Sequence, residues 1–220
     1  LVMTLFRSIS SSTTKIFIPA LPASLGFASY FIKFGFLFLD LKFHDITNTV
    51  KMACKNAIQK NVFMFNIHCS NGRKTMREVS NLVKETGSES LLIGVTVLTN
   101  LSGDDILEMF KSSLNVEEMV LNLATIAKNS GMHGIVCSPL ESAKIKEKLG
   151  QDFVTVCPGV RPAFTLNAQG KSDDDQNRIM TPFDAIKNNV DFLVVGRPIT
   201  KAKDPVESAK LILEEISQAL

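Results

Sequence analysis

From Leu37 onward, short runs of apolar and β-branched residues alternate with longer stretches in which apolar positions recur at helical spacing. The short runs predict strands over residues 37–41, 62–67, 91–97, 134–137, 153–156 and 192–195. The longer stretches predict helices over 48–59, 74–86, 104–110, 116–130, 139–149, 181–188 and 205–219. Strands separated by helices indicate βαβ units and a parallel sheet, and this number of strands favours a closed barrel over an open, doubly wound sheet.

Residues 1–36 depart from this alternation. Lys15–Pro19 fits a first strand, but a crossover between parallel strands takes at least about 10–12 residues beyond the strands themselves. Two complete βα units therefore do not fit before Leu37. We predict an α/β fold of the (βα)8 TIM-barrel type whose N-terminal strands can be incomplete, with an atypical segment over 1–36 and a barrel over 37–220.

The atypical segment is also unusual in composition. It contains no Asp or Glu, and its basic, hydroxyl-rich stretch over 7–15 resembles an organellar transit peptide. Residues 16–39 are mostly apolar and long enough to suggest a membrane span. Prolines, glycines and a lysine interrupt this stretch, at Pro19, Pro22, Gly26, Lys33 and Gly35. We therefore expect no membrane-spanning helix.

The composition of the whole chain argues against several classes of function. The net charge of +2 comes without a basic block, so we expect no nucleic-acid partner. The cysteines are widely spaced, which is typical of reduced thiols in a cytoplasmic protein rather than of disulfides or a zinc site. The histidines show no metal-ligand spacing, so we expect no metal. A length of 220 residues suits one undivided α/β barrel.

A cluster of charged residues lies at the end of the strand predicted over residues 37–41. Asp40 and Lys42 are two residues apart, so their side chains point to the same face of a strand, while Asp45 falls in the loop beyond it. Burying such charges is costly unless they pair, so a cluster of this kind usually has a functional role. A surface ion pair at a strand end would explain the same residues. The cluster by itself leaves both interpretations open.

The ends of the later strands favour the functional interpretation. In a βα barrel the active site lies at the carboxyl ends of the strands. Thr99 follows the strand over 91–97, Arg161 follows the strand over 153–156, and Gly196 and Arg197 follow the final strand. The last two strands are the seventh and eighth of a complete barrel, whose loops commonly bind phosphate. We therefore predict a phosphate-binding active site that includes the acid–lysine cluster.

Motifs along the chain resemble those of the orotidine 5′-phosphate decarboxylase family. They lie at residues 40–50 (DLKFHDITNTV), 94–99 (GVTVLT), 134–138 (GIVCS), 158–162 (PGVRP), 175–182 (DQNRIMTP) and 194–200 (VVGRPIT), in order from about Gly35 to the C-terminus. The resemblance implies a homodimeric βα barrel with shared active sites. It also implies a cytoplasmic carboxy-lyase that converts orotidine 5′-phosphate to UMP, the last step of pyrimidine synthesis, without metal or organic cofactor.

The same resemblance implies roles for the charged cluster. Lys42 would be the proton donor, because its ammonium would stabilise and protonate the carbanion left when CO₂ departs. Asp40 would crowd the substrate carboxylate and orient Lys42. Asp45, together with Ile46, would complete the active site of the partner subunit.

The implied substrate contacts extend around the barrel. Thr99 would contact the base or ribose, the phosphate would be bound by residues of the last two strand ends, and the loop over 159–178 would close over it. The full implied set is Asp40, Lys42, Asp45, Ile46, Thr49, Thr99, Pro158, Arg161, Gln176, Gly196 and Arg197.

The sequence departs from the family pattern at the head. Thr47 stands where the family usually has proline, and Pro22 stands where it has a ribose-binding aspartate. Lys33 superficially matches a second lysine of the charged cluster, but it is too close to Asp40 for a helical crossover, so we do not assign it that role.

These departures leave two alternatives. The first is an inactive remnant that at most binds nucleotides. The second is a sugar-phosphate decarboxylase of the same superfamily, which shares the D-x-K-x-x-D pattern; the stretches 44–49 and 158–162 speak against it.

Overall fold

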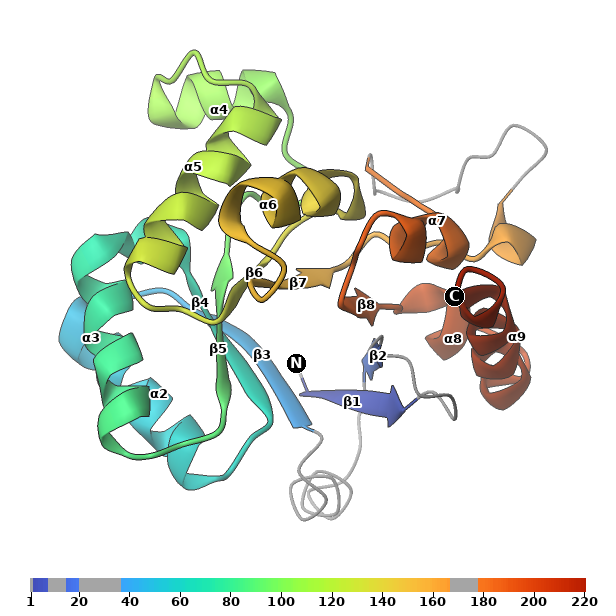
Figure 1. Ribbon diagram of the computed structural model, residues 1–220, viewed down its shortest axis with the longest axis horizontal. Coiled ribbons are helices and arrows are strands. Elements are labelled where there is room, and N and C mark those ends of the chain that lie inside the picture. Colours follow the sequence, from blue (N-terminus) through green and yellow to red (C-terminus); the bar gives the residue numbers. More distant parts are fainter. Residues whose placement is uncertain (1, 8–14, 20–36, 167–177) are drawn as a thin grey trace.

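The computed structural model (Figure 1) describes residues 2–7, 15–19, 37–166 and 178–220, the first two ranges by their backbone alone. Within these residues the strands form a closed barrel in the order β1-β2-β8-β7-β6-β5-β4-β3. The strands are β1 (Val2–Arg7), β2 (Lys15–Pro19), β3 (Leu37–Phe43), β4 (Met64–His68), β5 (Leu91–Val95), β6 (Gly134–Val136), β7 (Val154–Cys157) and β8 (Phe192–Val194). The predicted barrel architecture is therefore confirmed.

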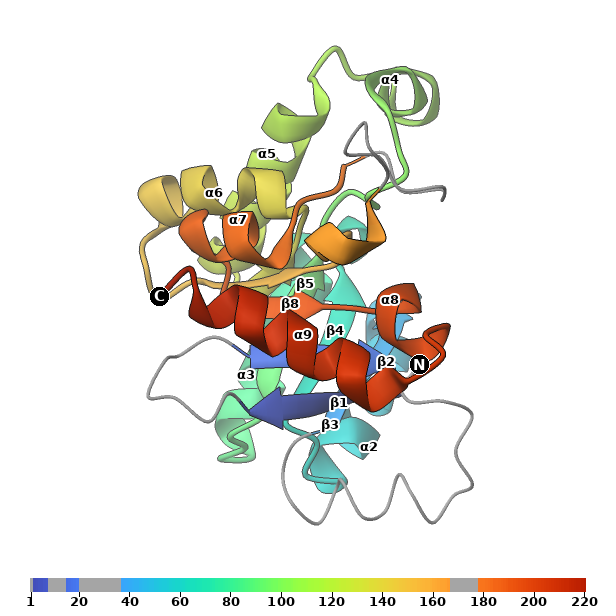
Figure 2. The same cartoon turned by 90° about the vertical axis from the view of Figure 1, so that its right-hand side faces the viewer.

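The helices cover the outside of the barrel between these strands. They are α2 (Thr47–Gln59), α3 (Gly72–Glu85), α4 (Gly103–Phe110), α5 (Val116–Asn129), α6 (Ser142–Leu149), α7 (Pro182–Lys187), α8 (Arg197–Thr200) and α9 (Pro205–Ser217). Short 3-10 turns are η1 (Cys69–Asn71), η2 (Pro139–Glu141) and η3 (Ala163–Thr165). Figure 2 shows α9 crossing in front of the barrel, packed against α7 and α8.

The arc from β3 to β8 agrees with the sequence prediction. Its strands are parallel and pair in sequence order, and each predicted strand lies within two residues of its observed bounds. The predicted helices are also present, although the stretch over 139–149 divides into η2 and α6. The short helix α8, directly after β8, was not predicted.

The head of the chain completes the barrel in a way the sequence did not predict. The predicted first strand is present as β2, which pairs in parallel with β8. Between β2 and β3, where a (βα)8 barrel ordinarily has a parallel strand, the barrel contains β1. This strand runs antiparallel to both β2 and β3. An antiparallel partner needs only a short connection rather than a helical crossover. This arrangement closes the sheet and removes its open edges.

The apolar window over 16–39 contains parts of two barrel strands. It begins within β2 and ends within β3, both of which pair with neighbouring strands. None of the helices that the structure describes combines the length and apolar character needed to cross a bilayer.

The parallel strands present two separate apolar faces. The larger cluster of buried side chains lies between the strands and the helices. A smaller cluster comes from alternate positions on five strands, namely Phe38, Met64, Ile93, Val156 and Phe192. Since side chains alternate along a strand, Asp40 and Asn66 share the face of Phe38 and Met64 and lie one layer closer to the carboxyl ends. The polar side chains of Asp40 and Asn66 therefore lie next to this layer of buried apolar side chains.

Side-chain caps fix where several helices begin. The Ser102 hydroxyl accepts a hydrogen bond from the backbone N–H of Asp105, whose carboxylate accepts one from the N–H of Ser102. Asn115 and Glu118 form the same reciprocal pair at the start of α5. Such capping boxes satisfy backbone donors that the first turn leaves unpaired.

Candidate active site

Asp40 and Lys42 form an ion pair at the carboxyl end of β3. The Lys42 Nζ lies 2.7 Å from Asp40 Oδ1 and 2.6 Å from Oδ2, and the Asp40 side chain is only 7% exposed. The two side chains therefore share a face, as their spacing predicts. A buried carboxylate against a partly exposed ammonium is a site where a fixed positive charge can stabilise a developing negative one.

The backbone that carries this pair is irregular. Leu39 pairs with Phe65 and Phe43 with Ile67, so more residues of β3 than of β4 lie between the two pairings. Lys42 has a φ of +51°, in the left-handed region that residues with a side chain seldom adopt. A bulge of this kind redirects a side chain and is common beside active sites.

Asn66, on β4, holds both members of the pair, and sequence reasoning missed it. Its Nδ2 donates a hydrogen bond to Asp40 Oδ1 at 2.6 Å, and its Oδ1 accepts one from the Lys42 backbone N–H at 2.8 Å. The Asn66 side chain is completely buried. The available signal was a polar amide within the otherwise apolar run that forms β4.

Asp45 lies in the loop beyond β3, as predicted, and its position is fixed by a second unpredicted amide. Asn71 Oδ1 accepts a hydrogen bond from the Asp45 backbone N–H at 3.0 Å, and Asn71 Nδ2 donates to the carbonyl oxygens of Phe43 and His68. The carbonyl bonds tie the end of β3 to the end of β4. Ile46, the next residue, is 74% exposed.

Two histidines stack beside the charged pair. The rings of His44 and His68 have centroids 4.9 Å apart. Burial lowers the pKa of His68, and the neighbouring His44 and Lys42 lower it further, while Asp40 acts in the opposite direction. A neutral His68 adds no second positive charge beside Lys42.

Thr47, where the family resemblance expects proline, is the first residue of α2. Its hydroxyl oxygen lies 2.8 Å from that of Thr75 on α3. The hydroxyl pair connects the two helices that follow the charged strands, so this departure from the family pattern leaves the local packing intact.

Arg178 connects the loops after β5 and β6. Its guanidinium forms an ion pair with Glu141 and donates a hydrogen bond to the Leu98 carbonyl oxygen at 3.2 Å, with the Thr99 carbonyl oxygen 3.5 Å away. Burial raises the pKa of the Glu141 carboxyl, and Arg178 partly offsets this. Sequence reasoning assigned no role to either residue, because they are far apart in the chain. Thr99 is thus anchored through its backbone.

The ends of β7 and β8 contribute turns and arginines. Gly159 has a φ of +82°, which glycine adopts without strain, and Val160 then pairs with Met180. Arg161 is buried and donates a hydrogen bond to the Val160 carbonyl oxygen. Gly196 is the N-cap of α8, and Arg197 is the first residue of that helix.

The structure places some, but not all, of the predicted site residues at one end of the barrel. Asp40, Lys42, Thr99, Pro158, Arg161, Gly196 and Arg197 all lie at or just beyond the carboxyl ends of parallel strands, which meet at one end of the closed barrel. Thr49 lies on the exposed side of α2. Gln176, like Pro22 and Lys33, lies outside the described residues. Within the part of the chain that the structure describes, no three His, Cys, Asp or Glu side chains gather as metal ligands.

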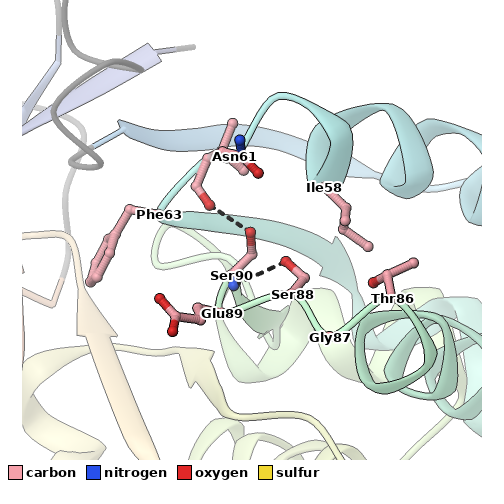
Figure 3. Close-up of a pocket in the computed structure, with 9 residues that line it drawn as sticks. Ile58, Asn61, Phe63, Thr86, Gly87, Ser88, Glu89 and Ser90 are labelled. Atoms are coloured by element: carbon pink, nitrogen blue, oxygen red, sulfur yellow. Dashed lines mark hydrogen bonds between the residues drawn. The ribbon is translucent and has the colours of Figure 1, made fainter.

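A cavity of about 560 Å³ lies at the opposite end of β4 and β5 (Figure 3). It is lined by residues that precede these strands, among them Asn61, Phe63, Ser88, Glu89 and Ser90. None of the predicted site residues lines it. In a parallel barrel this end of the strands usually serves stability rather than catalysis.

Comparisons with known proteins identify the family of this chain. Residues 23–212 match the family model "Orotidine 5'-phosphate decarboxylase / HUMPS family". The chain is 45% identical over 194 residues to an orotidine 5′-phosphate decarboxylase of Neisseria meningitidis serogroup C, covering 87% of this chain and 74% of that one. It is 46% identical over 189 residues to one of Vibrio parahaemolyticus, covering 84% of this chain and 77% of that one.

Solved structures show the same relationship. The crystal structure of orotidine 5′-phosphate decarboxylase from Lactobacillus acidophilus superposes with a TM-score of 0.68 at 35% identity, covering 81% of this chain and 74% of that one. An uncharacterised conserved protein from Geobacillus kaustophilus gives a TM-score of 0.65 at 31% identity, with coverages of 81% and 75%. The fold and the strand-end site define a βα-barrel enzyme. The chain belongs to the orotidine 5′-phosphate decarboxylase / HUMPS family.

Proposed function

We propose that this chain is a carboxy-lyase that decarboxylates orotidine 5′-phosphate to UMP, with Lys42 as the proton donor. The observation that carries the proposal is the contact of the Lys42 ammonium with the buried Asp40 carboxylate at the carboxyl end of β3. Relatives about 45% identical to this chain bear the name of that enzyme. No observation favours the inactive remnant or the sugar-phosphate decarboxylase.

The geometry suggests how the charged pair acts. The bond between C6 of the pyrimidine and the carboxylate breaks, CO₂ leaves, and the electron pair remains on C6. The Lys42 ammonium, fixed at that position, stabilises the negative charge and then transfers a proton to C6. Asp40 holds Lys42 in place and disfavours the substrate carboxylate by charge repulsion. The reaction needs no electron acceptor.

The other strand ends would bind the rest of the substrate. We assign the phosphate to Arg161, Gln176, Gly196 and Arg197, and the base or ribose to Thr99. Pro158 and Thr49 would complete the set of contacts. The loop over 159–178 would close over the phosphate, so that binding energy from a remote group favours the reacting arrangement.

We further propose a cytoplasmic homodimer in which Asp45 and Ile46 enter the partner's active site. The exposed position of Ile46 and the fixing of the Asp45 loop by Asn71 support this arrangement. Mixing Lys42→Ala and Asp45→Ala subunits tests it, because a hybrid dimer would contain one intact site. Recovered activity in the mixture is expected if sites are shared; no recovery despite subunit exchange would contradict sharing.

The activity itself is tested with the purified, folded chain and orotidine 5′-phosphate. We expect equimolar release of CO₂ and UMP, unaffected by a chelator. Folded protein that neither releases CO₂ nor binds UMP would support the inactive remnant instead. Chelator-sensitive decarboxylation of a sugar phosphate, without activity on orotidine 5′-phosphate, would support the related decarboxylase.

A further inference from the structure

We infer that Asn66 is a positioning residue that sets the distance and direction of the Lys42 ammonium relative to Asp40. The inference rests on the proposed function. A single buried amide on β4 contacts both members of the pair: it donates to the Asp40 carboxylate at 2.6 Å and accepts from the Lys42 backbone at 2.8 Å. Its side chain has no solvent exposure, so water does not substitute for it.

The irregular pairing of β3 explains why such a residue is needed. The register shifts between the pairings Leu39–Phe65 and Phe43–Ile67, and within this interval the Lys42 N–H donates to the side chain of Asn66. This hydrogen bond stabilises a Lys42 φ of +51°, a left-handed conformation that is unfavourable for lysine unless the surroundings support it. Without the bond, the backbone can relax and carry Nζ away from its place against Asp40.

The chemistry of the amide suits this position better than its close analogues. The site requires one acceptor, for the Lys42 N–H, and one donor, for the Asp40 carboxylate, and asparagine supplies both without charge. Aspartate would keep the acceptor but place a second carboxylate beside Asp40. Leucine, of similar size, would remove both hydrogen bonds.

The test compares Asn66→Leu and Asn66→Asp with the unmodified protein. We expect kcat for orotidine 5′-phosphate to fall about 10- to 100-fold in both variants, because small displacements of a reacting group are costly. KM and UMP affinity should change less than about threefold, since Asn66 is assigned no substrate contact. A kcat close to that of the unmodified protein in both variants would overturn the inference.

The pH dependence separates positioning from general destabilisation. In Asn66→Asp, a protonated carboxyl can again donate to Asp40 while its carbonyl oxygen accepts from the Lys42 N–H. The kcat of this variant relative to the unmodified protein should therefore rise as the pH falls. The other charged or titratable groups near Asp40 and position 66, namely Lys42, His68 and His44, are present in both proteins, so the ratio reports the added carboxyl. A ratio that stays flat or falls would contradict the hydrogen-bonding role.

Ser90→Ala is the matched control. Ser90 is also buried, and its hydroxyl donates to the Val62 carbonyl oxygen at 2.6 Å, but at the opposite end of the barrel (Figure 3). This variant should lose stability without losing kcat.

A readout without catalysis separates this inference from the proposed function. The rate at which an amine-acylating reagent modifies Lys42, followed by mass spectrometry, should rise several-fold in Asn66→Leu and remain unchanged in Ser90→Ala. If the unmodified chain is inactive but Lys42 is still acylated several-fold faster in Asn66→Leu than in that chain, the proposed function is refuted and the positioning of Lys42 by Asn66 stands. Equal acylation rates in all proteins would refute the positioning.

Discussion

At both ends of the barrel, polar side chains connect neighbouring strands by hydrogen bonds, but the backbone that they stabilise differs. At the carboxyl ends, Asn66 and Asn71 fasten a strained and charged stretch of β3 to β4. At the amino ends, side chains satisfy the backbone groups of adjacent strands. The Ser90 hydroxyl donates to the Val62 carbonyl oxygen, and His133 Nδ1 accepts from the Leu92 N–H at 2.9 Å.

The amino end also contains a charged group, but one that is used differently. Asp191, just before β8, accepts a hydrogen bond from the Thr155 N–H at 2.8 Å and forms an ion pair with the buried Lys146 at 2.6 Å. Lys146 also donates to the Gln151 carbonyl oxygen. Left-handed backbone also occurs at this end, at Asn61 (φ +50°) and Asn189 (φ +60°), but asparagine adopts it more readily than lysine. Asp191 and Lys146 themselves are paired without such a conformation, whereas Lys42, in the proposed active site, has a φ of +51°.

The largest expected effect is from Lys42→Ala at the carboxyl end. Removing the proton donor and the fixed positive charge should lower the decarboxylation rate by at least about a thousandfold. The midpoint of thermal unfolding should change less than for loss of a fully buried partner, because water can replace the 37% exposed Lys42 side chain and Asp40 keeps its hydrogen bond from Asn66. Assays of UMP formation and thermal unfolding measure the two quantities. Retention of most activity would refute the assigned role.

Asp191→Ala should show the reverse behaviour. It leaves the buried Lys146 without its carboxylate and should lower the free energy of unfolding by about 3 kcal/mol, while kcat at low temperature stays unchanged. Denaturant titration measures the loss. Asp191→Asn, which keeps an acceptor for the Thr155 N–H, is the matched control and should lose less. A large loss of kcat in folded Asp191→Ala would show that the ends are not functionally separate.

Arg197→Ala tests the phosphate end of the proposed site. Loss of a charge-assisted hydrogen bond of about 1.5–3 kcal/mol should lower kcat/KM for orotidine 5′-phosphate by roughly 10- to 100-fold. The same variant should not change the reaction of orotidine, which lacks the phosphate. Equal losses with both substrates would assign Arg197 a structural role instead.

The smallest expected effect is on the pH dependence of the unfolding free energy, through His133 at the amino end of the barrel. Burial lowers the pKa of His133, and Lys84 lowers it further, so the unfolded chain binds more protons near pH 6. The stability contributed by neutral His133 is therefore present above its unfolded pKa of about 6.5 and is lost as the pH falls through the folded value. His133→Asn keeps an acceptor but does not titrate. Its unfolding free energy should depend less steeply on pH below about 6.5; an unchanged slope would contradict this assignment.

Much of the fold could be predicted because it depends on local periodicity. The parallel strands from β3 to β8 and the helices between them follow from alternation and helical spacing, which short stretches of sequence determine. The same reasoning placed Asp40 and Lys42 on one face and Asp45 in the loop. It did not find β1, because the count allowed only for parallel strands joined by crossovers.

What the sequence by itself determined is therefore the order of strands and helices and the identity of the charged residues. The tertiary structure decided which neighbours fix them. Asn66 lies 24 residues from Lys42, and Glu141 lies 37 residues from Arg178, so no local pattern indicates either contact. The closure of the sheet brings these residues together, and burial makes their hydrogen bonds necessary, because a buried polar group without a partner is costly.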